Sequence, residues 1–262
     1  MTATGTLPPA TTDDVFLGGA LHILQPRDGY RAGLDAVLLA AAAPVEAGRG
    51  ERVLDVGAGV GVVGLAVARR VGDARLTLVE RDPEMAGCAR ANIERNGLAE
   101  RARVIEADVA RPLGEAEDLR AAAQSFDHVL ANPPYHVEGR GTAAGDAAKA
   151  AAHAMPDGGL ERWLRFMAAM ARSGGTATLI HRADALGEIL AACAGRFGGL
   201  AVLPLHAKDG EPAGRVLVQG TKGSRAPLVL LPGAVLHGPD GKFRPEIEAV
   251  LRAGAPFRVT RV

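Results

Sequence analysis

The sequence predicts an α/β fold with a largely parallel sheet, and three observations support this expectation. From Arg52 onward, short runs rich in β-branched residues alternate with longer runs of helix-forming residues. A glycine-rich turn at 57–61 separates the first strand of that series from the first helix. The composition, 48% hydrophobic and 23% charged, is that of a globular protein rather than a disordered chain. Such alternation is typical of βαβ units, in which the strands run parallel.

The chain of 262 residues is long enough for one large domain with modest appendages. Residues 1–14 are rich in Thr, Pro, Ala and Asp without periodicity, and we expect them to form a mobile tail. We expect residues 15–262 to form a single domain, in which a strand and helix extension, 15–50, precedes the sheet. The helix of this extension covers Leu34–Ala43, with Asp35 in its first turn.

Strands and helices then alternate. The predicted strands are Arg52–Val56, Arg75–Glu80, Arg103–Glu106, His128–Ala131, Thr176–Ile180, Leu200–Leu205, Arg215–Gln219 and Leu228–Leu231. The predicted helices are Val60–Arg70, Pro83–Asn96, Pro112–Ser125, Leu160–Arg172, Asp184–Arg196 and Pro245–Arg252. The strands at 200–205 and 215–219 are suited to antiparallel pairing. From His136 to Gly159 runs a Gly- and Ala-rich stretch without a core face, and loops of this length are usually functional or mobile.

Charge and cysteine content exclude several classes of protein. The 30 Lys and Arg residues balance the 30 Asp and Glu residues, so any site for a polyanion has to be a local basic patch. Cys88 and Cys193 are too few for a disulfide framework or a cysteine-based zinc site, and the seven histidines have no metal-ligand spacing, so we predict no metal. The longest apolar segment, Ala36–Ala43, is too short to span a bilayer. We expect a cytoplasmic protein without a membrane partner, either a monomer or a homodimer.

The strongest local signal is the glycine loop, which follows the strand Arg52–Val56. Gly57, Gly59 and Gly61 allow the backbone to approach a ligand at the carboxyl end of that strand. The spacing Gly59-x-Gly61-x-x-Gly64, with Glu80 21 residues after Gly59, also fits the dinucleotide fingerprint. The glycines by themselves therefore leave a nicotinamide-dependent oxidoreductase and a non-catalytic nucleotide-binding module open.

Acidic residues follow the same pattern at neighbouring strand ends. Asp55 stands at the end of the first strand of the sheet, Glu80 ends the second, and Asp108 lies just beyond the third. Any one of them alone is more simply a helix cap or a solvated carboxylate. Together they favour a ligand that carries an ammonium group, a ribose and an adenine.

The tetrapeptide Asn132-Pro133-Pro134-Tyr135 follows the next strand. Two prolines fix the chain direction and remove two N–H donors, which leaves carbonyl groups available as acceptors. A planar NH2 group is a poor nucleophile until acceptors hold its hydrogens, and the Asn132 side-chain oxygen and the Pro133 carbonyl are suited to this role. Tyr135 offers a face on which a planar group can stack. We therefore predict a catalytic role for these four residues.

These features resemble class I methyltransferases that use S-adenosylmethionine, and the tetrapeptide resembles the motif of those that methylate amino groups. The resemblance implies a Rossmann-like fold, a seven-stranded mostly parallel sheet with one antiparallel strand and helices on both faces. It implies that the glycine loop wraps the amino-acid part of the cofactor, that Glu80 binds the ribose and that Asp108 faces the adenine. The cofactor-binding set it implies is Asp35, Asp55, Gly57, Ala58, Gly59, Gly61, Glu80, Arg81, Asp108, Val109 and Asn132.

A closer resemblance covers nearly the whole chain. The segments that carry it are Phe16–Gly19, Gln25–Pro26, Gly29–Gly33, Asp35–Leu39, Pro232–Gly233, Leu236–His237, Asp240–Gly241 and Phe243, together with the glycine loop and the tetrapeptide. They look like the bacterial tRNA adenine-N6 methyltransferase family, which acts on valine tRNA beside the anticodon. This resemblance implies N-methylation of adenine N6 in tRNA.

Two other amino-group substrates remain alternatives, glutamine N5 of a release-factor-type protein and, less favoured, guanine N2 of rRNA. Protein-glutamine enzymes usually carry a separate helical domain ahead of the glycine loop, whereas about fifty residues precede it here. Loop cations that we expect around the site, in reach of phosphates, are Arg27, Arg31, Arg140, Lys149, Lys208, Lys222 and Arg225. Among the histidines, His136 is the one we expect near substrate, and we expect Trp163 and Phe166 to pack in the core.

Overall fold

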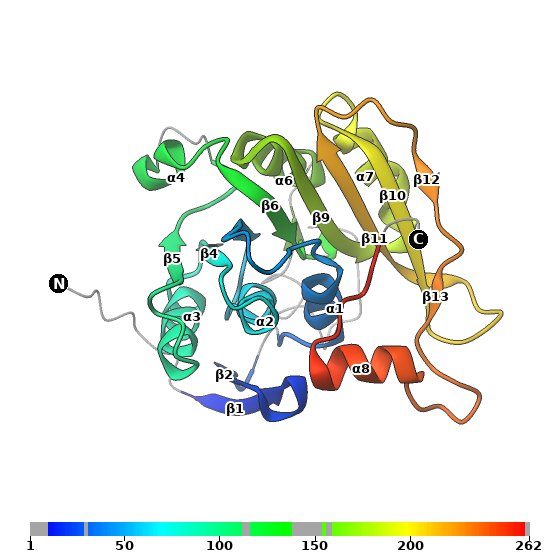
Figure 1. The fold of residues 1–262 in the computed structure, drawn as a ribbon, viewed down its shortest axis with the longest axis horizontal. Coiled ribbons are helices and arrows are strands. Elements are labelled where there is room, and N and C mark those ends of the chain that lie inside the picture. The colour runs from blue at the N-terminus through cyan, green and yellow to red at the C-terminus, as the bar shows by residue number, and fades with distance from the viewer. Residues whose placement is uncertain (1–9, 29–30, 112–115, 138–153, 156–158, 260–262) are drawn as a thin grey trace.

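A single large sheet organises the part of the chain that the computed structural model describes, residues 10–28, 31–111, 116–137, 154–155 and 159–259 (Figure 1). The sheet has nine strands in the order β12-β10-β11-β9-β6-β3-β4-β5, and β13 also pairs with β10. Their bounds are β3 Arg52–Val56, β4 Arg75–Glu80, β5 Ala102–Glu106, β6 Phe126–Ala131, β9 Ala171–Arg182, β10 Phe197–His206, β11 Ala213–Lys222, β12 Val229–Leu230 and β13 Ala234–Val235.

The seven strands from β5 to β10 have the predicted topology. The strands β3, β4, β5, β6 and β9 pair parallel with their neighbours in this set, whereas β11 pairs antiparallel with both β9 and β10. The α/β, Rossmann-like class is therefore confirmed. The predicted count of seven strands is wrong for the whole sheet, because the two-residue strands β12 and β13 add in parallel to the outer edge of β10.

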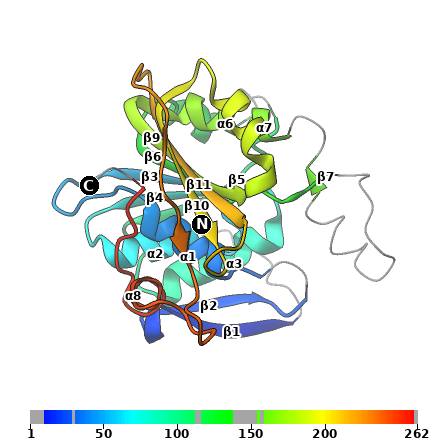
Figure 2. The same cartoon turned by 90° about the vertical axis from the view of Figure 1, so that its right-hand side faces the viewer.

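Helices cover both faces of the sheet, as Figure 2 shows from the side. By the core clusters they belong to, the helices on one face are α1 Leu34–Ala42, α2 Val62–Arg70 and α3 Pro83–Arg95, and those on the other are α4 Glu117–Ala121, α6 Gly159–Met170 and α7 Leu186–Cys193. Side chains alternate between the two layers along each strand. Val53 belongs to the core on the α1–α3 side, while Leu54 and Val56 belong to the core on the α6–α7 side. Burial on both faces explains why these strands are apolar throughout.

Several predicted boundaries differ from the structure. The helix predicted from Val60 begins at Val62, because Gly61 has a φ of +93° and cannot extend the helix. The helix predicted to end at Arg172 ends at Met170, and β9 begins at the next residue, Ala171. The helix predicted over 184–196 is the 3-10 turn η3 Ala183–Ala185 followed by α7. Of the helix predicted over 112–125, the described part is α4, and 112–115 lie outside the described residues.

The tail predicted over 1–14 is wrong for its last four residues, because β1 Thr11–Phe16 pairs antiparallel with β2 Leu21–Pro26 through the turn η1 Leu17–Gly19. Residues 1–9 lie outside the described residues. Polar contacts rather than apolar periodicity fix this strand: the Asp14 carboxylate accepts from Gln25 Nε2 at 2.8 Å and from Arg31. The hairpin lies beside α3 and α8 Pro245–Ala253, outside the α1–α3 layer (Figure 1).

The buried side chain of Asn92 attaches this hairpin to the rest of the domain. Its Oδ1 accepts from the Leu24 N–H at 2.7 Å, and its Nδ2 donates to the Leu24 carbonyl at 2.9 Å and the Val60 carbonyl at 3.0 Å. The amide therefore connects β2, α3 and the glycine loop with three hydrogen bonds.

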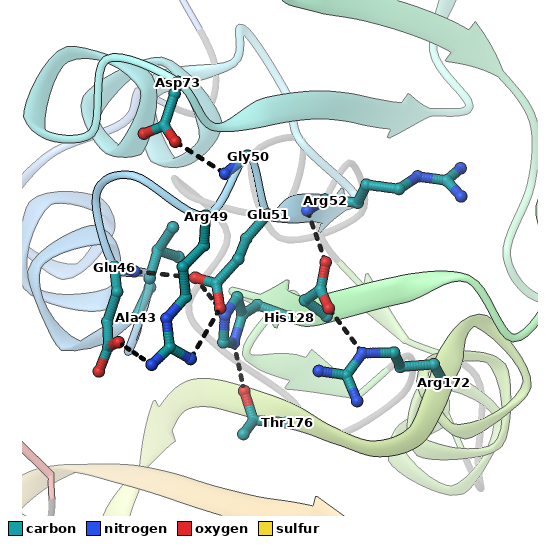
Figure 3. Close-up of polar contacts among 12 residues, drawn as sticks. Ala43, Glu46, Arg49, Gly50, Glu51, Arg52, Asp73, His128, Arg172 and Thr176 are labelled. Carbon is teal, nitrogen blue, oxygen red and sulfur yellow. Dashed lines mark hydrogen bonds and ion pairs between the residues drawn. The ribbon is translucent and has the colours of Figure 1, made fainter.

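A polar cluster fixes the amino-terminal edge of the sheet (Figure 3). His128 on β6 is buried, with Nδ1 2.8 Å from the Thr176 hydroxyl of β9 and Nε2 3.1 Å from the Glu51 carboxylate. Burial lowers the pKa of His128, although the neighbouring Glu51 opposes this shift. Arg52 N donates to Asp127 at 2.8 Å, and Arg172 pairs with the same carboxylate. These contacts lie opposite the carboxyl ends of the parallel strands.

Candidate functional site

The site predicted from the sequence lies at the carboxyl edge of the parallel strands, where polar residues from β3, β4, β5 and β6 follow one another. Strand order places β3 between β4 and β6, and β5 lies outside β4. The glycine loop leaves β3, Glu80 ends β4, Asp108 follows β5 and Asn132 follows β6. The fold thus brings the predicted groups to one edge, as expected for open α/β sheets.

The Glu80 carboxylate is hydrogen-bonded to the glycine loop. Its Oε2 accepts from the Gly59 N–H at 2.8 Å, and its Oε1 accepts from the N–H groups of Arg81 at 2.8 Å and Asp82 at 2.9 Å. A carboxylate offers about four lone-pair positions, so these three bonds leave one for a ligand. The side chain holds the loop in place and retains capacity to bind a hydroxyl.

Asp55 holds the first turn of α2, the helix that follows the loop. It is 1% exposed, and its Oδ2 accepts from the Gly64 N–H in α2 at 2.9 Å. Burial raises the pKa of Asp55 to about 7; the bond from Gly64 opposes this shift, and the negative charge of Glu80 adds to it. Because the carboxyl is enclosed, it acts on the first turn of α2, and the geometry does not support direct contact with a cofactor.

The loop itself has positive φ at Gly57, Gly59 and Gly61, with values of 63°, 55° and 93°. A Cβ at Gly57 would lie 2.3 Å from the Trp163 ring, whereas a Cβ at Gly59 would meet nothing within 4 Å. Trp163 is part of the core, as predicted, and its ring also lies against the loop at Gly57. Ala58 N donates to the Val79 carbonyl at 2.9 Å, which ties the loop to β4.

An open cavity of about 420 Å³ lies next to Glu80, lined by Arg81, Asp82, Asp108 and Arg111. Asp108 is half-buried, and its Oδ1 accepts from the Ala110 N–H at 2.9 Å. The neighbouring Val109 is half-buried and packs on the α6–α7 side core. The cavity is therefore lined by two acidic and two basic side chains at the predicted nucleoside end of the site.

Asn132 and Tyr135 are joined to Asp35 at the other end of the site. The Tyr135 hydroxyl lies 2.7 Å from Asn132 Oδ1 and 2.7 Å from Asp35 Oδ2. Asp35 stands at the start of α1, 100 residues from Tyr135 in sequence. The structure therefore places Asp35 with the tetrapeptide rather than with the glycine loop.

Two residues at this end were not predicted as site residues. Arg215 on β11 donates from Nε to Asp35 Oδ2 at 3.0 Å, and its guanidinium carbon lies 4.7 Å from the centre of the Tyr135 ring. His181 on β9 is buried and meets the same ring edge-on at 5.0 Å. Burial lowers the pKa of His181, opposed by backbone hydrogen bonding at Pro134. β11 and β9 pair antiparallel with Val216 opposite His181, so Arg215 and His181 lie on adjacent strands at the same edge of the sheet.

The predicted ring of basic residues is only partly at this edge. Lys208 lies in the loop after β10, at the carboxyl edge, and is exposed. The prediction is wrong for Lys222 and Arg225. Because β11 runs antiparallel, its end lies at the opposite edge of the sheet, where Lys222 Nζ donates to the Ala171 carbonyl at 2.7 Å. Arg31 is paired with Asp14 on the hairpin, and Arg27 is exposed after β2.

His136 begins β7 His136–Val137, which pairs parallel with β8 Ala154–Met155. The side chain of His136 and the residues Arg140 and Lys149 lie outside the described part of the structure. Within the described part, no group of three or more His, Cys, Asp or Glu residues is arranged to hold a metal ion. In the same part, no helix is long and apolar enough to cross a membrane.

Comparison with known proteins decides the family. The model of the methyltransferase small domain matches residues 34–168, just over half of the chain. The chain belongs to this family. The matched segment begins one residue before Asp35 and includes the glycine loop, Glu80, Asp108 and the tetrapeptide. The family predicted from the sequence is thereby confirmed at the level of this domain.

Individual relatives of this methyltransferase domain fall into two groups. The tRNA1(Val) (adenine(37)-N6)-methyltransferase of Shewanella sp. (strain W3-18-1) is 35% identical over 118 residues, which are 45% of this chain and 47% of that protein. The chain thus matches about half the length of such curated relatives. A solved structure from Agrobacterium tumefaciens, described as a predicted O-methyltransferase, protein Atu636, is 35% identical, with a TM-score of 0.71 over 87% of this chain and 100% of that one.

A more distant structure shares the fold alone. TYW2 from P. horikoshii, solved in complex with MeSAdo, is 16% identical, with a TM-score of 0.53 over 82% of this chain and 72% of that one.

Proposed function

We propose that this protein is an S-adenosylmethionine-dependent methyltransferase that modifies a planar NH2 group, adenine N6 of a tRNA near the anticodon. The observation that carries the proposal is the position of Asn132-Pro133-Pro134-Tyr135 after β6, the strand beside β3. The glycine loop follows β3 and is held by Glu80, while Asp55 holds the first turn of α2. Membership in the methyltransferase small domain family and the names of the relatives support it.

The cofactor fits the loop end of the site on three counts. The open side of Gly59 admits a ligand close to the backbone, because no atom lies within 4 Å of a Cβ built there. Glu80 keeps one lone-pair position for a ribose hydroxyl after its three backbone bonds. The cavity beside Asp108 suits a nucleoside, with Asp108 as acceptor for an adenine amino group and Arg81 at its rim.

When bound, S-adenosylmethionine supplies an electrophilic methyl group on a sulfonium sulfur. The protein's part is to make the target nitrogen nucleophilic. The lone pair of an exocyclic NH2 is delocalised into the ring until both hydrogens are held out of the ring plane. Asn132 and the Pro133 carbonyl are the two acceptors that hold them, and Tyr135 orients the base. Because the NH2 group carries its own electron pair, the transfer step needs no general base.

A tRNA loop is a better substrate than duplex nucleic acid for a site of this kind. An unpaired base already lies outside a stack, so its entry costs less free energy than base flipping. With 30 basic and 30 acidic residues, phosphate contact has to come from local cations such as Lys208. We therefore expect methylation to weaken with added salt and to fail on free adenosine.

The experiment is label transfer from tritiated cofactor to separate pools of tRNA, rRNA, release factor and DNA from a deletion strain. We expect label in tRNA as N6-methyladenosine, identified by nucleoside mass spectrometry. Label in release factor and not in tRNA would replace the RNA substrate with a glutamine amide. Label in rRNA as N2-methylguanosine would show that the target is guanine N2 of rRNA and not adenine N6 of tRNA.

The Agrobacterium neighbour makes hydroxyl methylation the further alternative to test. Oxygen has no second hydrogen for two acceptors to hold, so Asn132→Ala should affect O-methylation little and N-methylation strongly. A ribose 2′-O-methyl product in the tRNA digest, insensitive to Asn132→Ala, would overturn the proposed NH2 chemistry.

A further inference from the structure

Arg215 contacts Tyr135 and Asp35 at the same time. Its guanidinium carbon lies over the Tyr135 ring, 4.7 Å from the ring centre, and its Nε donates to Oδ2 of Asp35 at 3.0 Å. The Tyr135 hydroxyl lies 2.7 Å from that same carboxylate oxygen. Arg215 is therefore connected to the tyrosine twice, directly through the ring and indirectly through the carboxylate that the hydroxyl contacts.

The charge of Arg215 is used within this group of residues. Burial lowers the pKa of Arg215, but the hydrogen bond and the charge of Asp35, and after them the interactions with Tyr135, raise that pKa overall. The side chains of Arg215 and Asp35 are 37% and 23% exposed, so water only partly screens the ion pair. A planar guanidinium can stack on an aromatic ring and donate to a carboxylate at once, which an ammonium group cannot do. Arg215 is therefore suited to hold Tyr135 and is a poor contact for an RNA phosphate.

The backbone of Arg215 is held more firmly than that of Tyr135. Arg215 lies within β11, opposite Arg182 of β9, and β11 is paired on its two sides with β9 and β10. Tyr135 lies between β6 and β7, outside both strands. His181, also on β9, meets the tyrosine ring edge-on at 5.0 Å with an interplanar angle of 78°. Residues of two paired strands thus support a ring that belongs to a loop.

We propose that Arg215 is a positioning residue that fixes the plane of the Tyr135 ring and leaves one face of that ring for the target base. A guanidinium over one face of the ring prevents stacking there, so a planar group can stack only on the other face. The target NH2 group is then presented from one side, in a plane that the ring sets. The inference deepens the proposed function and rests on it, because it requires that Tyr135 orients the base.

The plane of the base affects the rate, because methyl transfer needs the nitrogen lone pair in line with the sulfur–methyl bond of the cofactor. A displacement of about 1 Å at a reacting group can cost on the order of a hundredfold in rate. Loss of the Arg215 side chain opens the second face of the Tyr135 ring and frees the tilt of the ring. A smaller fraction of bound bases then has the reactive orientation. We therefore expect the loss in kcat and not in the affinity for the cofactor.

The first test observes the tyrosine ring itself and needs no substrate. The chain has two tyrosines, so a sample with labelled tyrosine rings gives two sets of NMR signals, and the Tyr135→Phe spectrum identifies those of Tyr135. A neutral paramagnetic cosolute relaxes ring protons according to their exposure to solvent. We expect stronger relaxation of the Tyr135 ring protons in Arg215→Ala than in the wild type. Equal relaxation in the two proteins would overturn the proposal, because Arg215 would then not cover the ring in solution.

The second test compares Arg215→Ala and Arg215→Lys in methylation of tRNA at saturating cofactor. We expect both variants to lower kcat roughly tenfold to a hundredfold, because lysine keeps the charge but has no planar group to stack on the ring. The Kd for S-adenosylhomocysteine should stay within about twofold of wild type, since only the chemical step is affected. Arg182→Ala is the matched control and should turn over like the wild type, because Arg182 lies opposite Arg215 in the sheet and pairs instead with the exposed Asp184.

A role of Arg215 as a phosphate contact predicts a different result, which would overturn the proposal. Arg215→Lys would then keep most of the activity, and Arg215→Ala would raise KM for tRNA at unchanged kcat and reduce the slope of log K against log salt by about 1. Melting temperatures check folding, and if Arg215→Ala does not fold, Arg215→Lys alone separates the two roles. Failure of the proposed function has another signature: the relaxation of the Tyr135 ring would follow our expectation while no Arg215 variant changed methylation of tRNA.

Discussion

The carboxylate of Glu80 offers the sharpest test of how the glycine loop is held. Glu80→Gln keeps the shape of the side chain and changes one oxygen to NH2. Two N–H groups, those of Arg81 and Asp82, point at Oε1, so the amide oxygen has to occupy that position. The NH2 group then faces the Gly59 N–H, donor against donor, where the wild type has a bond of 2.8 Å. The variant therefore loses the hydrogen bond that the Gly59 N–H donates to Glu80.

The size of the effect follows from that single bond. A hydrogen bond to a charged group contributes about 1.5–3 kcal/mol. A loop that is no longer held must be ordered by the ligand, so this free energy is lost from binding. Since about 1.4 kcal/mol corresponds to a factor of ten, the Kd for S-adenosylhomocysteine should rise roughly tenfold to a hundredfold.

Calorimetric titration with S-adenosylhomocysteine measures this change, with the melting temperature as a check on folding. Glu84→Gln is the matched control, because it makes the same charge change at an exposed position in the first turn of α3. An unchanged Kd in Glu80→Gln, or equal losses in both variants, would refute the reasoning. A parallel titration with NAD should give no binding at the same concentrations.

Three further predictions address the other parts of the structure. Asn132→Ala should leave the Kd for S-adenosylhomocysteine within about twofold of wild type and lower turnover on tRNA on the order of a hundredfold, as expected for a lost polar group at the reacting centre. Calorimetry measures the Kd and label transfer measures the turnover. A loss of cofactor affinity as large as the loss of turnover would contradict the assignment. Burial lowers the pKa of His128 in the folded protein, so as the pH falls the unfolded chain binds a proton at this residue before the folded protein does. The contribution of His128 to stability is therefore fully present above about pH 6.5, the ordinary pKa of histidine, and decreases as the pH falls below that value. Melting temperatures at pH 7.5 and 5.5 should therefore differ less for His128→Gln than for wild type, and an equal difference would remove His128 as a cause. Lys208→Ala should weaken tRNA binding and reduce the slope of log K against log salt by about 1, whereas Lys222→Ala should do neither, because its ammonium is held at the opposite edge of the sheet; filter binding over a salt series checks both.

The sequence predicts those parts of the site that depend on local order. Asp55, Glu80, Asp108 and Asn132 each follow an apolar strand, and parallel strands bring their carboxyl ends to one edge, so their gathering follows from alternation alone. The same argument predicts the glycine loop, where Gly61 ends the loop and α2 begins.

Residues that meet through long-range pairing are not predictable in this way. Arg215 reaches Asp35 across 180 residues, and nothing in its local sequence distinguishes it from other strand arginines. Lys222 is the converse case, since an antiparallel strand carries its last residue away from the site. The strand at Thr11–Phe16 was missed because its polar residues make cross-strand contacts instead of an apolar face.

The separation between Tyr135 and Arg215 also has a consequence for synthesis of the protein. The cation that covers the Tyr135 ring is encoded 80 residues after it, on a strand that must insert beside β9. At about 5–20 residues per second, a ribosome takes roughly 4–16 s to make that segment. For that interval a growing chain already contains the glycine loop, Glu80 and the tetrapeptide, yet lacks the Arg215–Asp35 pair. A nascent chain stalled before Arg215 therefore contains the residues of the glycine-loop end of the site but lacks the cation that covers the Tyr135 ring, so that the two ends of the site are completed at different times in the life of one molecule.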